Sequence, residues 1–283
     1  MGLKAKTTAI NPMGEDAYNG LVGEIVETIE PQTEADPALI LVGTLVAFGS
    51  FIGRKPFYQV ESTRHYTNEN ALFVGPTSKG RKGTGWDRIR ELYNSAADMG
   101  NRNDDWCSRI KSGLSSGEGI IGQFVGEGVD KRLMCVEPEF ARTLAACERN
   151  GSTLSAILRD AWDQGRLATL TKQALEVDDA HVSIIGHITD TELRKRLTNT
   201  DAANGFANRF LFVHVERSQL LAFGGKDIDF RPLAKKLWNA RTKAQNVDRM
   251  TWTKKAATQW AEVYAELSRD RGNIGQDPRG AER

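Results

Sequence analysis

Short apolar runs alternate with amphipathic segments along most of the chain. Apolar residues occupy positions 71–74, 133–136, 182–185 and 210–215, and each run is bounded by glycine or polar residues, as buried parallel strands are. Between the runs, apolar residues recur at helical spacing at Trp86, Ile89, Leu92 and Tyr93, and further helices are predicted at 138–148 and 154–162. This alternation predicts an α/β fold with a doubly wound, mostly parallel sheet flanked by helices.

The pattern also divides the chain into regions. Residues 1–36 read as a helical leader, with a helix at 17–29 and a proline-rich linker at 31–37. Residues 37–225 form the predicted core, which begins with an apolar segment at 38–52 and a short strand at 56–62. Residues 226–271 hold two amphipathic helices, at 232–244 and 254–267, and residues 272–283 are expected to be a disordered tail.

Charge and cysteine content narrow the functional class. The 38 basic and 37 acidic residues leave a formal net charge of +1, so the protein has no global field that attracts a polyanion. The three cysteines are too few and too scattered for a disulfide framework or a zinc site, which predicts free thiols in a reducing cytoplasm. The apolar segment 38–52 is interrupted by glycine and polar residues and is shorter than a membrane span, so we expect a buried helix and no membrane partner.

The glycine-rich segment between the first apolar run and the next helix carries the strongest chemical signal. A phosphate-binding loop needs glycines that let backbone N–H groups turn inward, a lysine for the β and γ phosphates, and a hydroxyl for Mg²⁺. The segment supplies all three, but Arg81 stands between Gly80 and Lys82, and Gly83 separates Lys82 from Thr84. Either the loop bulges or Arg81 shares the role of the lysine; a basic surface loop is the alternative. The predicted nucleotide-binding residues are Gly75, Thr77, Ser78, Lys79, Gly80, Arg81, Lys82, Gly83 and Thr84, with Thr84 also on the metal.

Two carboxylates follow the second apolar run. Pro138 should end that strand, which leaves Glu137 and Glu139 at the carboxyl edge of the sheet, where ligands of such folds bind. Glu137 is therefore predicted to hold Mg²⁺, and Glu139 to position or deprotonate a water molecule. The alternative is that either residue caps the next helix.

These segments together resemble a known family. The resemblance covers roughly residues 20–267 and rests on segments 75–84, 112–119, 136–140, 186–189 and 204–210. On these residues the chain is similar to an uncharacterised, primase-helicase-associated ATPase family of phage, plasmid and other mobile-element replication proteins. The resemblance implies a RecA-like P-loop NTPase with ATP and Mg²⁺, DNA as a partner, a primase or other replication protein nearby, and a homo-oligomer. It also implies further helical sequence after residue 271, so a truncated product is one interpretation of this chain.

Within that resemblance, other residues receive roles. Glu118 competes with Glu139 for positioning water, although residues 115–119 also read as a flexible turn. His187 and Thr189 would sense the γ phosphate, against the alternative that His187 is a core residue. Asn208 would contact the nucleotide. Arg209 would be an arginine finger that acts on the nucleotide of its own chain or of a neighbouring subunit, and the alternative is a salt bridge at a strand end.

The competing functional class is a non-hydrolysing nucleotide-binding or scaffold module.

The six tryptophans are scattered and are explained as core residues. The basic cluster at 194–196 reads as a solvated helix face, and contact with a phosphate backbone is its alternative.

Overall fold

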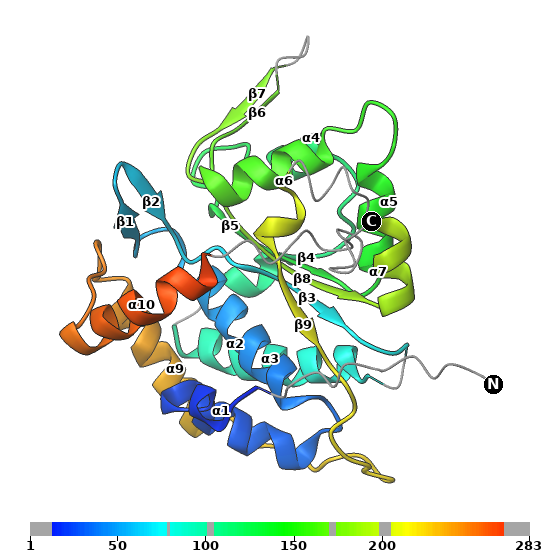
Figure 1. The fold of residues 1–283 in the computed structure, drawn as a ribbon, viewed down its shortest axis with the longest axis vertical. Coiled ribbons are helices and arrows are strands. Elements are labelled where there is room, and N and C mark those ends of the chain that lie inside the picture. The colour runs from blue at the N-terminus through cyan, green and yellow to red at the C-terminus, as the bar shows by residue number, and fades with distance from the viewer. Residues whose placement is uncertain (1–12, 78–79, 101–104, 170–173, 198–204, 269–283) are drawn as a thin grey trace, which may run out of the picture.

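The computed structural model describes residues 13–77, 80–100, 105–169, 174–197 and 205–268. Its centre is a sheet of five parallel strands in the order β4-β5-β8-β3-β9 (Figure 1). The strands are β3 (Asn70–Val74), β4 (Ile110–Lys111), β5 (Arg132–Glu137), β8 (His181–Ile188) and β9 (Leu211–His214). The predicted α/β class and the parallel sheet are confirmed, and the arrangement is compatible with a Rossmann-like or RecA-like fold.

Helices cover both faces of the sheet (Figure 1). One face packs against α1 (Gly20–Ile29), α2 (Pro37–Ile52), α3 (Lys82–Ala97) and α9 (Arg231–Ala244). The other packs against α4 (Gly117–Gly122), α5 (Phe140–Cys147), α6 (Leu154–Asp163) and α7 (Asp190–Arg196). Because both faces of the sheet are covered, every residue of β3 and β8 is buried, and each strand contains a largely apolar run, at 71–74 in β3 and at 182–185, interrupted by Ser183, in β8.

The apolar segment after the leader forms the buried helix α2. Asp36 caps it by accepting a hydrogen bond from the Ala38 amide at 2.9 Å, Pro37 occupies its first position, and Gly53 ends it at φ +78°. Among the described residues, no helix is long and apolar enough to span a membrane. The leader helix α1 packs against α2 and α9 in the same core, so residues of the predicted leader belong to the main fold.

Several local elements differ from the sequence prediction. The strand expected at 56–62 is an antiparallel hairpin of β1 (Tyr58–Val60) and β2 (Thr63–His65), outside the main sheet. A second hairpin, β6 (Leu167–Thr169) with β7 (Leu175–Val177), and the short strand β4 had no clear apolar run to predict them. The described residues also include α10 (Lys254–Leu267) and short 3-10 turns at Glu15–Ala17, Glu30–Gln32, Asp98–Gly100, Trp106–Arg109 and Ala207–Arg209.

The connections that leave neighbouring strands β3 and β8 diverge. The chain leaves β3 for α3 on one face, whereas it leaves β8 for α7 on the opposite face. In open α/β sheets this divergence opens a crevice at the carboxyl ends of the two strands, and ligands bind there. The topology therefore directs attention to the loops after β3 and β8.

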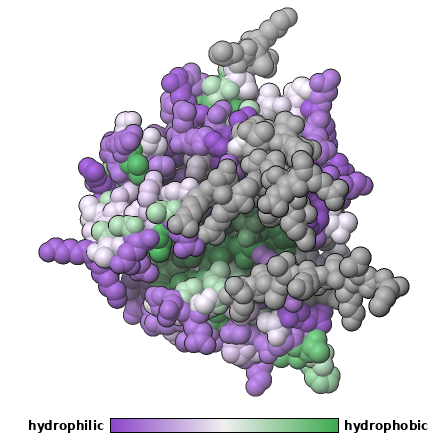
Figure 2. Space-filling view, viewed as in Figure 1, coloured by the Kyte–Doolittle hydropathy of each residue, from purple (hydrophilic) through white to green (hydrophobic). Residues whose placement is uncertain are grey.

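The surface seen in Figure 2 is hydrophilic around its rim. A hydrophobic protrusion at the lower right corresponds to the loop that follows β9, in which Leu220 and Phe223 are 77% and 104% exposed. Such isolated apolar side chains are common on protein surfaces and carry no ligand-binding argument by themselves.

We expect Gly186→Ala to destabilise the fold, because a Cβ atom there would lie 2.5 Å from Cδ2 of Leu72 and 2.6 Å from Cδ2 of Phe140. Overpacking of this kind costs about 1–3 kcal/mol, measured as a lower midpoint of urea unfolding. Gly122→Ala is the matched control, since a Cβ atom there meets nothing within 4 Å. Equal stabilities of the two variants would contradict this description of the β8 packing.

Candidate functional site

The loop after β3 closes tightly against the neighbouring strands. The Gly75 amide donates to the carbonyl of Ile188 at 3.1 Å, and the Gly80 amide donates to the carbonyl of Pro76 at 3.3 Å. A Cβ atom on Gly75 would lie 2.1 Å from the carbonyl oxygen of Val215, so only glycine fits at this point. Ser78 and Lys79, two of the predicted ligands, lie outside the described residues.

Lys82 is the first residue of α3 and folds back onto this loop. Its Nζ donates to the carbonyl oxygens of Gly75 at 2.7 Å and Pro76 at 3.0 Å. Burial lowers the pKa of the Lys82 ammonium, while the charge of Glu192 acts in the opposite direction. The structure therefore holds a partly desolvated cation against neutral carbonyls, where an anionic ligand would be a stronger partner.

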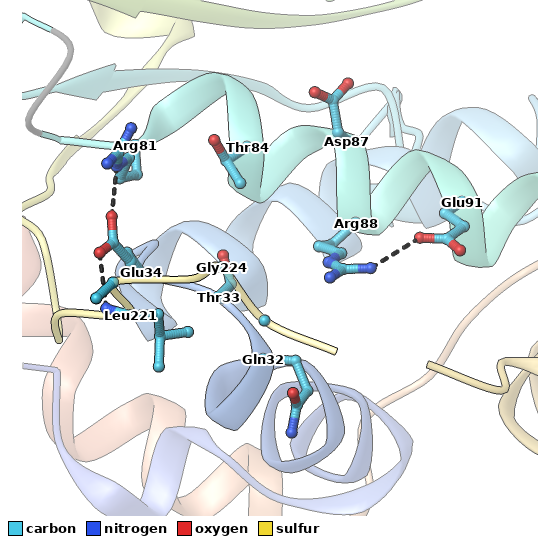
Figure 3. A pocket seen from close by; sticks show the side chains of 12 residues that line it. Gln32, Thr33, Glu34, Arg81, Thr84, Asp87, Arg88, Glu91, Leu221 and Gly224 are labelled. Atoms are coloured by element: carbon cyan, nitrogen blue, oxygen red, sulfur yellow. Dashed lines mark hydrogen bonds and ion pairs between the residues drawn. The ribbon is translucent and has the colours of Figure 1, made fainter. Parts of the chain in front are cut away.

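Arg81 is oriented differently from Lys82. It precedes α3 in the left-handed region at φ +48°, and its Nε lies 2.5 Å from Oε2 of Glu34. Glu34 also accepts a hydrogen bond from the Leu221 amide at 2.8 Å, and this bond, with Arg81, lowers the pKa of the carboxyl. Figure 3 shows this ion pair at a hollow of about 530 Å³ beside α3. In this conformation the Arg81 guanidinium does not join Lys82.

A cavity of about 430 Å³ lies at the carboxyl ends of β3 and β8. This volume suits a small-molecule ligand. The first amides of a helix have no hydrogen-bond partner within the helix. In α3 the first hydrogen bond of the helix runs from the Gly85 amide to the Arg81 carbonyl at 3.0 Å. The N-terminal turn of α3 thus presents backbone amides of the kind that bind anions in other proteins. The cavity is lined by Pro76, Thr77, Arg81, Lys82, Gly83, Thr84, Pro138, Glu139, His187, Ile188, Thr189 and Glu192.

His187 forms part of the wall of this cavity. The side chain is buried, with only 4% exposed, and its ring centroid lies 6.0 Å from that of Phe73. Burial, with a smaller contribution from the charge of Lys82, lowers the His187 pKa to about 4, so the imidazole is neutral at pH 7. Among the described residues its Nε2 atom has no hydrogen-bond partner, which leaves a buried polar atom available to a ligand in the cavity.

Thr189 also borders the cavity but is engaged in a capping box. Its hydroxyl donates to Oε2 of Glu192 at 2.7 Å and accepts from the Glu192 amide at 3.2 Å. The pKa of the Glu192 carboxyl is lowered by the hydrogen bonds that it accepts from the Thr189 hydroxyl and, at 3.2 Å, from the Thr189 amide. Glu192 was missed by sequence reasoning, although the Thr-x-x-Glu spacing after an apolar run was the signal for it.

The two carboxylates after β5 lie in different environments. Glu137 is buried, and its Oε1 accepts hydrogen bonds from the amides of Gly113 at 2.7 Å and Leu114 at 2.9 Å. It is absent from the cavity lining. Glu139 does line the cavity, but it is exposed and forms an ion pair with Arg142 at 2.7 Å.

The remaining predicted residues lie elsewhere. Glu118, in the first turn of α4, accepts a hydrogen bond from the hydroxyl of Thr153 at 3.2 Å and does not line the cavity. Arg209 precedes β9 at the amino edge of the sheet, where it binds Asp163 with Nη2 to Oδ2 at 2.6 Å. Asn208 is exposed at the same amino edge. Within one chain, therefore, neither Arg209 nor Asn208 reaches the cavity at the carboxyl edge, and the observed contact of Arg209 is the salt bridge at a strand end.

Comparison of the chain with protein-family models and with the curated proteins finds no match. Volume alone does not single out a site either, since the amino edge carries another hollow of about 580 Å³. The cavity at the carboxyl edge is distinguished by its chemistry: a partly buried lysine, a helix N-terminus and a buried histidine.

We expect the His187 imidazole to stay neutral on acidification until about pH 4. Because this value is below the ordinary pKa of 6.5, the unfolded chain binds the proton more tightly, and stability falls as pH drops from about 6.5 toward 4. Histidine ¹H–¹⁵N spectra across this range measure the titration directly. Protonation of His187 near pH 6.5 in the folded protein would contradict the burial described here.

Proposed function

We propose that the chain binds a nucleoside triphosphate, ATP by its family resemblance, in the cavity at the carboxyl ends of β3 and β8. The observation that carries the proposal is the position of Lys82 at the N-terminus of α3, with its Nζ 2.7 Å from the Gly75 carbonyl. The loop precedes this helix at the point where the connections diverge, which is the general location for ligands in such sheets. A RecA-like P-loop role for residues 75–84 is part of this proposal.

The residues present fit a chain of phosphates. Lys82 can exchange its two carbonyl contacts for phosphate oxygens, which are charged and bind an ammonium more strongly. The free amides at the start of α3 and the helix dipole act on the same anion. In the tautomer with its proton on Nε2, neutral His187 can donate a hydrogen bond to a phosphate oxygen without adding charge.

Mg²⁺ would enter with the nucleotide. Among the described residues there is no cluster of three or more His, Cys, Asp or Glu side chains able to hold a metal ion. Mg²⁺ commonly takes one or two protein ligands together with phosphate oxygens and water, and the position of Thr84 on the cavity wall supports it as the proposed protein ligand. Glu137 is less favoured as a direct ligand, because it does not line the cavity and its Oε1 binds two backbone amides.

Hydrolysis requires a group that orients water, and Glu139 is the candidate that the cavity favours. It lines the cavity, whereas Glu118 does not. Its ion pair with Arg142 is exposed, and such pairs are held by about 1 kcal/mol or less, so the carboxylate is readily released. The second candidate function is nucleotide binding without hydrolysis. It is favoured because Glu137 accepts hydrogen bonds from backbone amides and Glu139 is paired with Arg142, so neither carboxylate is free to act on water in this conformation.

Work on DNA, a primase partner and assembly into a homo-oligomer remain predictions from the family resemblance. The basic cluster adds little to the DNA prediction, because Arg194 pairs with Asp190 at 2.8 Å and Arg196 with Glu148 at 3.0 Å. This matches a solvated helix face.

Calorimetric titration with Mg²⁺-ATP tests the binding proposal. Lys82→Ala should weaken binding on the order of 10- to 100-fold, as loss of a charged hydrogen bond of about 1.5–3 kcal/mol implies. Lys55→Ala is the control, because Lys55 is an exposed lysine whose only ion pair among the described residues is with Asp248 at 3.9 Å. A folded wild-type protein that binds no ATP would refute the proposal.

Phosphate release separates hydrolysis from simple binding. If Glu139 positions water, Glu139→Gln should lower kcat about 100-fold or more with little change in ATP affinity, as general-base contributions of this size imply. Glu118→Gln, whose carboxylate lies away from the cavity, should leave turnover near the wild-type value. Binding without turnover in the wild type would favour the non-hydrolysing module.

A further inference from the structure

Helix α10 projects from the fold with its side chains exposed. Thr253 caps it by accepting a hydrogen bond from the Ala256 amide at 3.2 Å, so the helix has a defined start. None of its residues is buried, and Figure 1 shows it at the margin of the molecule, beside α9 and below the β1–β2 hairpin. This amphipathic helix therefore has a face that the described part of the chain leaves open.

That open face is apolar and partly aromatic. Trp260, Val263, Tyr264 and Leu267 follow one side of the helix and are 41%, 37%, 55% and 59% exposed. Trp252 extends the stripe beyond the helix start, stacked on Trp260 at 5.7 Å with an interplanar angle of 17°. The explanation of the tryptophans as core residues is therefore wrong for Trp252 and Trp260, although it holds for Trp86 and Trp106.

The aromatic residues are ordered by the rest of the fold. The indole of Trp252 donates a hydrogen bond to the hydroxyl of Tyr58 in β1, and the two rings meet edge to face at 5.5 Å. Trp260 in turn contacts Tyr264 at 5.5 Å. A row of aromatic side chains fixed in this way loses little conformational entropy on binding, which is typical of interface anchors.

The charges beside the stripe are arranged by sign along the helix. Lys255, Gln259, Glu262 and Glu266 follow one flank at spacings of four, three and four residues. The basic residue is near the start of the helix and the two acidic residues are near its end. In an antiparallel pair of such helices the same flanks face each other, so Lys255 of one copy would meet Glu266 of the other and compete with the interaction that Glu266 already makes within its own chain.

We propose that α10 is a self-association surface and that its occupant is the α10 helix of a second copy of this chain, packed antiparallel about a two-fold axis. The flank is complementary to itself only in that orientation, and a two-fold interface uses the same patch on both subunits. The contact is separate from the nucleotide cavity, so it neither depends on ATP nor needs the proposed function.

A single-stranded nucleic acid is the other occupant that exposed tryptophans suggest. The surface favours a protein instead, because Val263 and Leu267 offer no stacking plane and the acidic flank of Glu262 and Glu266 repels phosphates. Large exposed apolar patches with a polar border are typical of protein interfaces.

Sedimentation equilibrium of the full chain without nucleotide tests the proposal. The wild type should form dimers, and Trp260→Asp should raise the dimer dissociation constant about 30-fold or more, as loss of a central aromatic anchor does. Phe223→Asp is the control, since this side chain is fully exposed in the loop after β9 and should leave association unchanged. Far-UV circular dichroism checks that the variants keep their helices.

Charge reversal makes the test specific for the antiparallel pairing. Lys255→Glu and Glu266→Lys should each weaken the dimer about tenfold, through like charges on both sides of the axis. An equimolar mixture of the two variants should recover association, because each mixed dimer has opposite charges at both contacts. The double variant should recover it as well.

Three results would overturn the proposal. A wild type that remains monomeric at every concentration excludes a second copy as the occupant. A dimer that is indifferent to Trp260→Asp places the interface elsewhere. A monomer whose tryptophan fluorescence is quenched by oligothymidylate, with the quenching lost in Trp260→Asp, would assign the surface to single-stranded nucleic acid.

Discussion

Parallel pairing of β3 with β8 determines where the cavity at the carboxyl edge of the sheet lies. The pairing sets Val74 opposite Ile188, so the two strands end at the same level and their following loops begin side by side. One loop then enters α3 on the first face and the other enters α7 on the second. The space between these loops cannot be filled by either helix, and the cavity of about 430 Å³ lies there.

The electrostatics of the cavity follow from this geometry. The positive charge of Lys82 adds to burial in lowering the pKa of His187, whereas the pKa of Lys82 is lowered by burial. Glu192 supplies the compensating negative charge while it is bound to Thr189. An incoming phosphate would shift this balance, because it offers Lys82 a full charge in place of two carbonyl dipoles. Arg81 contributes to a different set of contacts, through Glu34, Leu221 and the packing of the leader against α3.

Much of the central architecture was accessible from the sequence, because strands that are buried on both faces leave mostly apolar runs. The runs at 71–74, 133–136 and 182–185 became β3, β5 and β8, and helix α6 begins where its periodicity begins. Strand β4 has only the residues Ile110 and Lys111, too short for any pattern, and the β1–β2 hairpin depends on a turn at Glu61, which has a positive φ of 50°. Local turn conformation of this kind is weakly encoded in residue type.

The candidate site was predictable in part for a similar reason. Glu139 and His187 lie at the carboxyl ends of β5 and β8, Lys82 begins the helix that follows β3, and all three line the cavity. The direction of a side chain depends on its tertiary partners, which the sequence does not display. Glu137 turns toward the amides of Gly113 and Leu114, and Arg209 toward Asp163, because those partners come from segments distant in the chain. Glu118 was predicted to position water, but it does not line the cavity, because α4 packs against α6.

The central claim is that an anion binds between the loops after β3 and β8. Backbone amide NMR spectra recorded during titration with a non-hydrolysable ATP analogue and Mg²⁺ test it most directly. The largest shifts are expected at Gly80, Lys82, Gly83 and Thr84, with a change in the His187 ring and none at Arg209. Shifts that cluster around Arg209 and Asp163 at the amino edge, or no shifts at all, would contradict it.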